Sequence, residues 1–207
     1  MIQKPAGVLV HRQHRSDETA IVQLMRDQLG RKIWLAHRLD RATSGCLVIA
    51  LDPAHVAPLA NALANGQKTY LALVRGQVQE DEFTVDRALK DDRGRMKEAQ
   101  TRFRILASSP DPRCSLVEAR PKTGRTHQIR RHLVGLSHPI LGDSKHGDTR
   151  ENRRWRENWG LPRLALHCRS IAFQPFDTPV EITAPLPADL RGLLQQMPWW
   201  EEVQHRI

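Results

Sequence analysis

One uninterrupted apolar run, residues 45–51 (Gly-Cys-Leu-Val-Ile-Ala-Leu), constrains the fold more than any other part of this chain. Its length and its β-branched residues predict a strand that is buried on both faces. Such a strand needs other strands beside it and further elements that cover its two faces. The run therefore predicts a globular domain with a sheet at the centre of its core.

Helical patterns flank this run on both sides. Apolar residues at helical spacing, Ile21, Leu24, Met25 and Leu29, predict a helix that is capped by Ser16 or Asp17 and ended by Gly30. A second helix is predicted over 53–65, because a proline opens it and an Asn-Gly pair closes it.

The rest of the chain alternates short extended patterns with a few helices. The sum predicts an α+β fold, a single domain over 1–207 built on a mixed, largely antiparallel sheet flanked by helices. The polar stretch 91–100 is expected to be a mobile loop. The other expected strands cover 8–10, 68–74, 83–85, 101–106, 115–119, 171–173 and 180–182, and the other expected helices cover 127–135, a segment around 155–159 and a final one from about 187.

The charge balance favours a polyanionic partner. Lysine and arginine number 32 against 23 acidic residues, so the net charge is +9 and the pI is near 10.2. A basic protein of this kind binds nucleic acid through phosphate contacts and counterion release. No apolar run is long enough to span a membrane, and residues 1–7 lack the apolar core of a signal peptide, so we expect no membrane partner and a cytoplasmic location. The three cysteines, far apart and odd in number, predict buried free thiols.

Residues 37–45 (His-Arg-Leu-Asp-Arg-Ala-Thr-Ser-Gly) could carry chemistry. Asp40 lies between Arg38 and Arg41, directly before the apolar run. Nearby guanidinium groups favour the ionised carboxylate, and an ionised, desolvated aspartate is a competent nucleophile. The alternative is a turn in which Asp40 and Arg38 form only an ion pair.

Residues 121–133 bring many hydrogen-bond donors to a turn and a helix start. A helix N-terminus suits a phosphate group, so Lys122, Arg125 and His127 are candidate RNA contacts. On the helix itself, Arg130 could point inward and pair with Asp40. The alternative is a solvated basic helix.

Four ordered motifs resemble those of the RluA-type pseudouridine synthases, along nearly the whole chain. They are Lys4-Pro5-Ala6-Gly7, the stretch 37–45, Lys68-Thr69-Tyr70 and the stretch 122–132. Within that family, the stretches 136–148 and 150–153 are most similar to the tRNA pseudouridine synthase C group.

The resemblance implies a role for each matching residue. Asp40 would be the essential aspartate, Arg130 the basic residue paired with it, and Tyr70 the tyrosine that stacks on the base and assists proton removal. Arg38 would fill the RNA stack that the target nucleotide has left, because a carboxylate cannot reach a stacked base.

The resemblance also implies the partners. The substrate would be RNA, with the uridine at about position 65 of tRNA as the target, and neither a metal nor a coenzyme would be needed. We expect no separate N-terminal S4-like domain, so that the surface of the catalytic domain itself would hold the RNA, and we expect a monomer. Arg153 and Arg154 are candidate contacts, because they lie on a helix whose indoles, Trp155 and Trp159, should face the core.

Other functions remain as alternatives. A metal-dependent nuclease would need clustered ligands, but His127 and His132 lie five residues apart and no Cys-rich or H-E-x-x-H spacing exists. A synthase acting on ribosomal RNA and a non-catalytic RNA-binding module stay open. An RNA-binding module has no need for the carboxylate of Asp40 close to phosphates, whereas a synthase requires that carboxylate.

Overall fold

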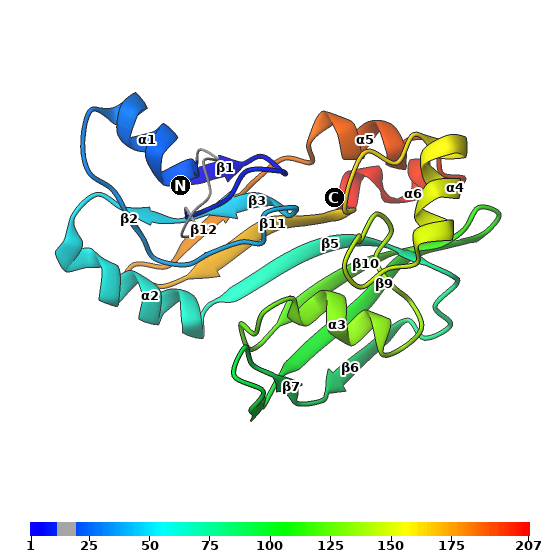
Figure 1. The fold of residues 1–207 in the computed structure, drawn as a ribbon, viewed down its shortest axis with the longest axis horizontal. Helices are drawn as coiled ribbons and strands as arrows, with labels where there is room; N and C mark the ends of the chain where they lie inside the picture. The colour runs from blue at the N-terminus through cyan, green and yellow to red at the C-terminus, as the bar shows by residue number, and fades with distance from the viewer. Residues whose placement is uncertain (12–19) are drawn as a thin grey trace. The chain divides into compact units, whose positions relative to one another are not determined.

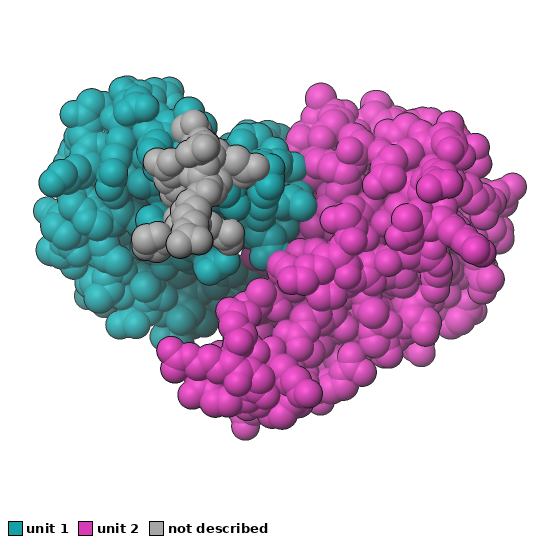
Figure 2. All heavy atoms as spheres, in the orientation of Figure 1, with its two compact units in different colours: residues 1–68, 168–185 teal, residues 69–167, 186–207 magenta. Residues whose placement is uncertain are grey.

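The computed structural model describes residues 1–11 and 20–207, so the cap predicted at Ser16 or Asp17 lies outside the described residues. Two compact units form, residues 1–68 with 168–185 and residues 69–167 with 186–207 (Figure 2). The chain has the predicted α+β fold, with strands in a largely antiparallel sheet and helices beside them (Figure 1).

The first unit places its longer strands in the order β1-β3-β11, with β12 beside β11, and pairs β2 with β4 separately. As predicted, α1 ends where Gly30 takes a left-handed conformation, with φ of 61°. The elements are β1 (Ile2–Lys4), α1 (Ile21–Leu29), β2 (Trp34–Leu35), β3 (Ser44–Leu47), β4 (Ile49–Ala50), a 3-10 turn (Pro53–His55), α2 (Val56–Asn65), most of β11 (Leu166–Phe173) and β12 (Val180–Thr183).

The apolar run 45–51 forms two strands, and the prediction of one continuous strand is wrong. Strand β3 pairs with β1, whereas β4 pairs with β2. Between them the backbone N–H of Val48 donates to Nε2 of His37 at 2.9 Å. A side chain from outside the run thus takes the hydrogen bond that would have continued the ladder, and the chain changes partner there.

The second unit places its strands in the order β5-β10-β9-β6, all antiparallel where their pairings are given, and has a separate β7-β8 hairpin. Its elements are β5 (Gln67–Arg75), β6 (Glu82–Asp86), β7 (Leu89–Lys90), β8 (Met96–Lys97), β9 (Gln100–Pro110), β10 (Arg113–Pro121), α3 (Gln128–Val134), α4 (Thr149–Trp159), α5 (Ala188–Leu194), α6 (Trp200–Val203) and a 3-10 turn (Gln204–Arg206).

Helix α3 is tied to β9 by a buried polar network. The hydroxyl of Thr101 accepts from Nε2 of Gln128 and bonds Nδ1 of His132, both at 3.0 Å. The other ring nitrogen of His132 bonds the carbonyl of Arg87 at 3.1 Å, so it carries the proton and Nδ1 accepts from Thr101. Burial lowers the pKa of His132, which fits this neutral ring. The network fixes the helix that carries Arg130.

Two further predictions are wrong. Residues 8–10 form no strand, because the carbonyl of Val8 accepts from Nζ of Lys4 and that of Leu9 accepts from the backbone of Ile21. Residues 91–100 contain the turn and second strand of the β7-β8 hairpin instead of a loop, because the carboxylate of Asp91 accepts two backbone N–H groups across that turn. The three cysteines are buried and free, as predicted.

A glycine-specific position tests the packing of β3. Gly45 has φ of 119°, and a Cβ built there would lie 2.1 Å from the carbonyl oxygen of Cys168. We expect Gly45→Ala to lower the free energy of unfolding by at least about 2 kcal/mol, from backbone strain and this collision. Urea unfolding measures it. The control is Gly30→Ala, which has φ of 61° and no atom within 4 Å. Equal losses in the two variants would contradict the predicted collision.

The buried ring of His37 predicts a pH dependence of stability. Burial, and secondarily the charge of Lys68, lower the pKa of His37 from 6.5 to about 4. The unfolded chain therefore binds this proton first, so the stability from the neutral ring is present above pH 6.5 and is lost as the pH falls toward 4. The loss should reach up to about 3 kcal/mol.

Urea unfolding at pH 7, 5.5 and 4 measures this loss. The comparison variant is His37→Gln, whose amide oxygen can accept the Val48 bond without titrating. Subtracting the free energies of unfolding of the two proteins at each pH cancels the contribution of the other titrating groups. Parallel pH curves would contradict the assignment.

Candidate active site

Asp40 lies in a turn between β2 and β3. The backbone N–H of Thr43 donates to the carbonyl of Asp40 at 3.1 Å, which closes the turn. The adjacent Leu39 is buried and anchors the segment, while Asp40 itself is half-buried and Arg38 is exposed. The turn therefore holds Asp40 and the neighbouring Arg38 directly before β3 in the first unit.

A buried lysine holds this turn in place. The side chain of Lys4 is fully buried, and its Nζ donates to the carbonyls of Pro5, Val8 and Arg41 at 2.7, 2.9 and 3.1 Å. Gly7 strengthens the same contact, because its N–H donates to the carbonyl of Arg41 and its own carbonyl accepts from Nε of Arg41, both at 2.9 Å. Residues 4–8 thus clasp the residue that follows Asp40.

Tyr70 lies on the face of the second unit's sheet that α3 covers. It is directly opposite Ala119 on β10, which is directly opposite Phe103 on β9. Residues paired in this way share a face, and Thr101, two residues from Phe103, is on that face as well. Because Thr101 bonds α3, the tyrosine and this helix belong to one side of the sheet.

Arg130 is buried on α3, so the alternative of a solvated basic helix is wrong. Its Nε and one Nη donate to the two carboxylate oxygens of Asp143, each at 2.7 Å. Burial opposes ionisation of Asp143, but hydrogen bonds from Arg130 and from the backbone of His146 and Lys145 outweigh it and lower the carboxyl pKa. The pair is therefore ionic.

The predicted phosphate contacts surround the start of α3. Lys122 and Arg125 are exposed, and the side chain of Gln128 closes the turn by accepting from the backbone of Arg125 at 3.0 Å. His127 has a left-handed backbone, with φ of 54°, and its Nδ1 lies 2.8 Å from Nε2 of His146. Burial lowers the pKa of His146.

Helix α4 carries the other predicted contacts. Arg153 and Arg154 are exposed, and Trp155 is buried with its indole N–H donating to Glu151 at 2.9 Å. The exposed arginines and the buried Trp155 agree with the prediction, whereas Trp159 is only half-buried. Asp148 caps the helix by accepting two backbone N–H groups.

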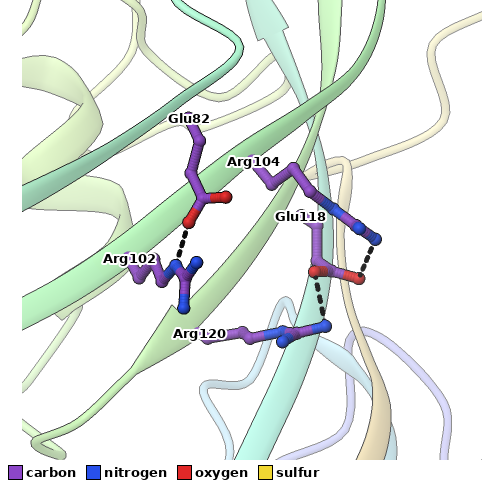
Figure 3. A pocket seen from close by; sticks show the side chains of 5 residues that line it. All are labelled: Glu82, Arg102, Arg104, Glu118 and Arg120. Carbon is purple, nitrogen blue, oxygen red and sulfur yellow. Dashed lines mark hydrogen bonds and ion pairs between the residues drawn. The ribbon is translucent and has the colours of Figure 1, made fainter.

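A charged pocket lies on the opposite face of the same sheet (Figure 3). Glu118 is directly opposite Leu71 on β5 and Arg104 on β9. Because side chains alternate between the two faces along a strand, Glu118 points away from the face of Tyr70, which is next to Leu71. Glu118 pairs with Arg104 at 3.4 Å and with Arg120 at 2.9 Å, and Arg102 pairs with Glu82. This pocket is separate from the face of Tyr70.

Two of the nine predicted site residues, Arg38 and Asp40, belong to the first unit, and the other seven belong to the second. The pairing of Asp40 with Arg130 stays a prediction. Sequence reasoning missed Asp143, although the Gly142-Asp143 pair within the stretch 136–148 was a signal for it. Within residues 1–11 and 20–207, no group of three or more His, Cys, Asp or Glu side chains could hold a metal ion, and no helix is long and apolar enough to cross a membrane.

Comparisons with known proteins identify the family of this chain. Residues 1–134 match the family described as RNA pseudouridylate synthase. The chain is 39% identical to tRNA pseudouridine synthase C of Vibrio cholerae, over 98% of this chain and 93% of that protein, and 38% identical to the protein of the same name from Salmonella typhimurium, over 96% and 86%. The structure is similar to that of human RNA Pseudouridylate Synthase Domain Containing 4, with a TM-score of 0.77, 26% identity and coverage of 93% and 87%. The chain therefore belongs to the RNA pseudouridylate synthase family.

Proposed function

We propose that this protein converts one uridine of a tRNA to pseudouridine, with Asp40 as its catalytic carboxylate. The observation that carries the proposal is the pair of hydrogen bonds from Lys4 and Gly7 to the carbonyl of Arg41. These bonds fix the turn of the half-buried Asp40 within a strongly basic chain. A protein that only binds RNA has no use for a carboxylate held in that way, because it repels phosphate. The relatives named tRNA pseudouridine synthase C support tRNA over ribosomal RNA as the substrate. The target at about position 65 rests on the resemblance of residues 136–148 and 150–153.

In this proposal each side chain has a distinct task. The target uridine leaves the RNA stack, and Arg38 takes its place. Tyr70 stacks on the base and assists proton removal. Arg130 pairs with Asp40 through donors other than the two that Asp143 accepts, and so keeps the carboxylate ionised. The uracil detaches from the ribose and rejoins through carbon, which conserves all atoms and needs no cofactor.

The catalytic domain itself would hold the RNA. Exposed cations at the start of α3 and on α4 are suited to phosphates, and the net charge of +9 favours approach of a polyanion. A monomer in the cytoplasm suffices for this function. The cations are Lys122, Arg125, Arg153 and Arg154, and the half-buried His127 is a further proposed RNA contact.

The target is tested by mapping pseudouridines chemically in total RNA from cells with and without this gene. Loss of one tRNA pseudouridine supports the proposal. Loss of a site in ribosomal RNA alone would move the assignment to the ribosomal alternative. No lost site, together with intact RNA binding, would favour the non-catalytic binding module.

Asp40→Asn tests the catalytic role. We expect single-turnover conversion to fall by more than about 1,000-fold while RNA affinity and folding are kept, because the amide has the shape of the carboxylate without its charge. The control is Asp27→Asn, the same change on an exposed residue of α1. Substantial activity in Asp40→Asn would remove this residue from the chemistry.

A division of labour among the arginines is tested by salt-dependent binding. We expect Arg153→Gln and Arg154→Gln each to lower the slope of log affinity against log salt by roughly one unit, with similar losses for cognate and unrelated RNA. Arg38→Ala should slow single-turnover conversion more than it weakens binding, because it acts after the complex forms. Arg26→Gln on α1 is the charge-matched control. The reverse pattern would show that the two regions are assigned backwards.

A further inference from the structure

The ion pair of Arg130 and Asp143 is buried and bidentate. The side chain of Arg130 is 7% exposed and that of Asp143 is fully buried. The contact is bidentate, with Nε donating to Oδ2 and Nη2 donating to Oδ1 at 2.7 Å each. Two parallel bonds to one carboxylate fix both the position and the plane of a guanidinium group.

The contact with Asp143 uses only one edge of the Arg130 guanidinium. A guanidinium has five N–H groups in a planar fork, and the contact uses the edge made by Nε and one Nη. The neighbouring edge, made by both Nη atoms, can bind a second carboxylate in the same plane. The side of Arg130 that faces Asp143 therefore determines where the second edge points.

Asp143 is itself held by several bonds, so it can act as a fixed reference. Its Oδ1 also accepts the backbone N–H groups of Lys145 and His146, both at 2.9 Å. Its carbonyl accepts from Nδ2 of Asn152 at 3.0 Å, and Oδ1 of Asn152 accepts from the N–H of Gly142 at 2.7 Å. Asn152 is buried on α4, so this helix anchors the loop that carries Asp143.

We propose that Asp143 is a positioning residue, which orients the Arg130 guanidinium so that its second edge meets the catalytic carboxylate. This inference rests on the proposed function, because it assigns Arg130 to Asp40. Without the carboxylate of Asp143, the side chain of Arg130 loses its fixed plane while its helix stays in place. The chemical step then slows, whereas RNA binding, which depends on exposed cations, does not change.

A double-mutant cycle separates this role from a merely structural one. The variants are Arg130→Met, Asp143→Asn and both together, with single-turnover rate and RNA affinity measured for each. We expect Asp143→Asn alone to lower the rate by at least about tenfold with affinity within about twofold, and to change the rate by less than about twofold in the Arg130→Met background. Asp148→Asn, on the same loop but without contact to Arg130, is the control and should keep the rate.

Additive rate losses in the cycle would overturn the inference, because Asp143 would then act independently of Arg130. An unchanged rate in Asp143→Asn would overturn it as well. Since Asp143→Asn leaves a buried guanidinium without its carboxylate and is expected to be destabilised, Arg130→Lys gives a second test. It keeps the charge and an ion pair but lacks the planar fork, so a wild-type rate in Arg130→Lys would also contradict a role for orientation.

A spectroscopic readout keeps this inference distinct from the proposed function. The Nε–H signal of Arg130, assigned by its absence in Arg130→Lys, should exchange slowly with water in the wild type and at least about tenfold faster in Asp143→Asn. Fast exchange in the wild type would contradict a fixed contact between Arg130 and Asp143, whatever the activity. A protected signal with no pseudouridine formed in any RNA would instead contradict the proposed function.

Discussion

The buried ammonium of Lys4 is the interaction on which the first unit depends. An ammonium group is costly to bury unless its N–H groups are bonded, and here three backbone carbonyls accept them. One of these carbonyls belongs to Arg41, so the bond joins the N-terminal strand to the turn of Asp40. Lys4 is also paired with Gly45 in the β1–β3 ladder, and Gly45 packs against the backbone of β11. Lys4 thus links the turn of Asp40 to the sheet, through its side chain on the one hand and its backbone pairing on the other.

The sequence predicted the elements whose signals are local and failed where a distant group took a backbone bond. Helix α1 ends at Gly30 because only the local left-handed conformation matters there. The apolar run 45–51 is divided because His37, outside the run, accepts from Val48. Residues 8–10 are not extended into a strand because Lys4 and Ile21 take two of their carbonyls. Periodicity within a segment carries no information about such partners.

The candidate site follows the same division. The sequence singles out Asp40 because its motif is contiguous, and the catalytic role of this residue stays a prediction. The inward direction of Arg130 could be predicted because helical spacing separates a buried face from an exposed one. The partner of Arg130 at Asp143 could not be derived from spacing, since Asp143 follows Arg130 by 13 positions, across a helix end and a loop. A charged residue in a loop has many possible partners, and the fold selects one. The Gly142-Asp143 pair was present in the sequence, but its position opposite Arg130 depends on the hydrogen bonds with Asn152 on α4.

The charged pocket on the far face of the second unit's sheet affects how a polyanion would meet the protein. Its three arginines and two glutamates leave a net charge of +1, whereas the whole chain has +9. Each of the three arginines already has a carboxylate partner, Glu82 for Arg102 and Glu118 for Arg104 and Arg120. A phosphate at this face would have to compete with those carboxylates for the guanidinium donors. The pocket is therefore a weaker electrostatic target for a polyanion than a cluster of arginines without acidic neighbours would be.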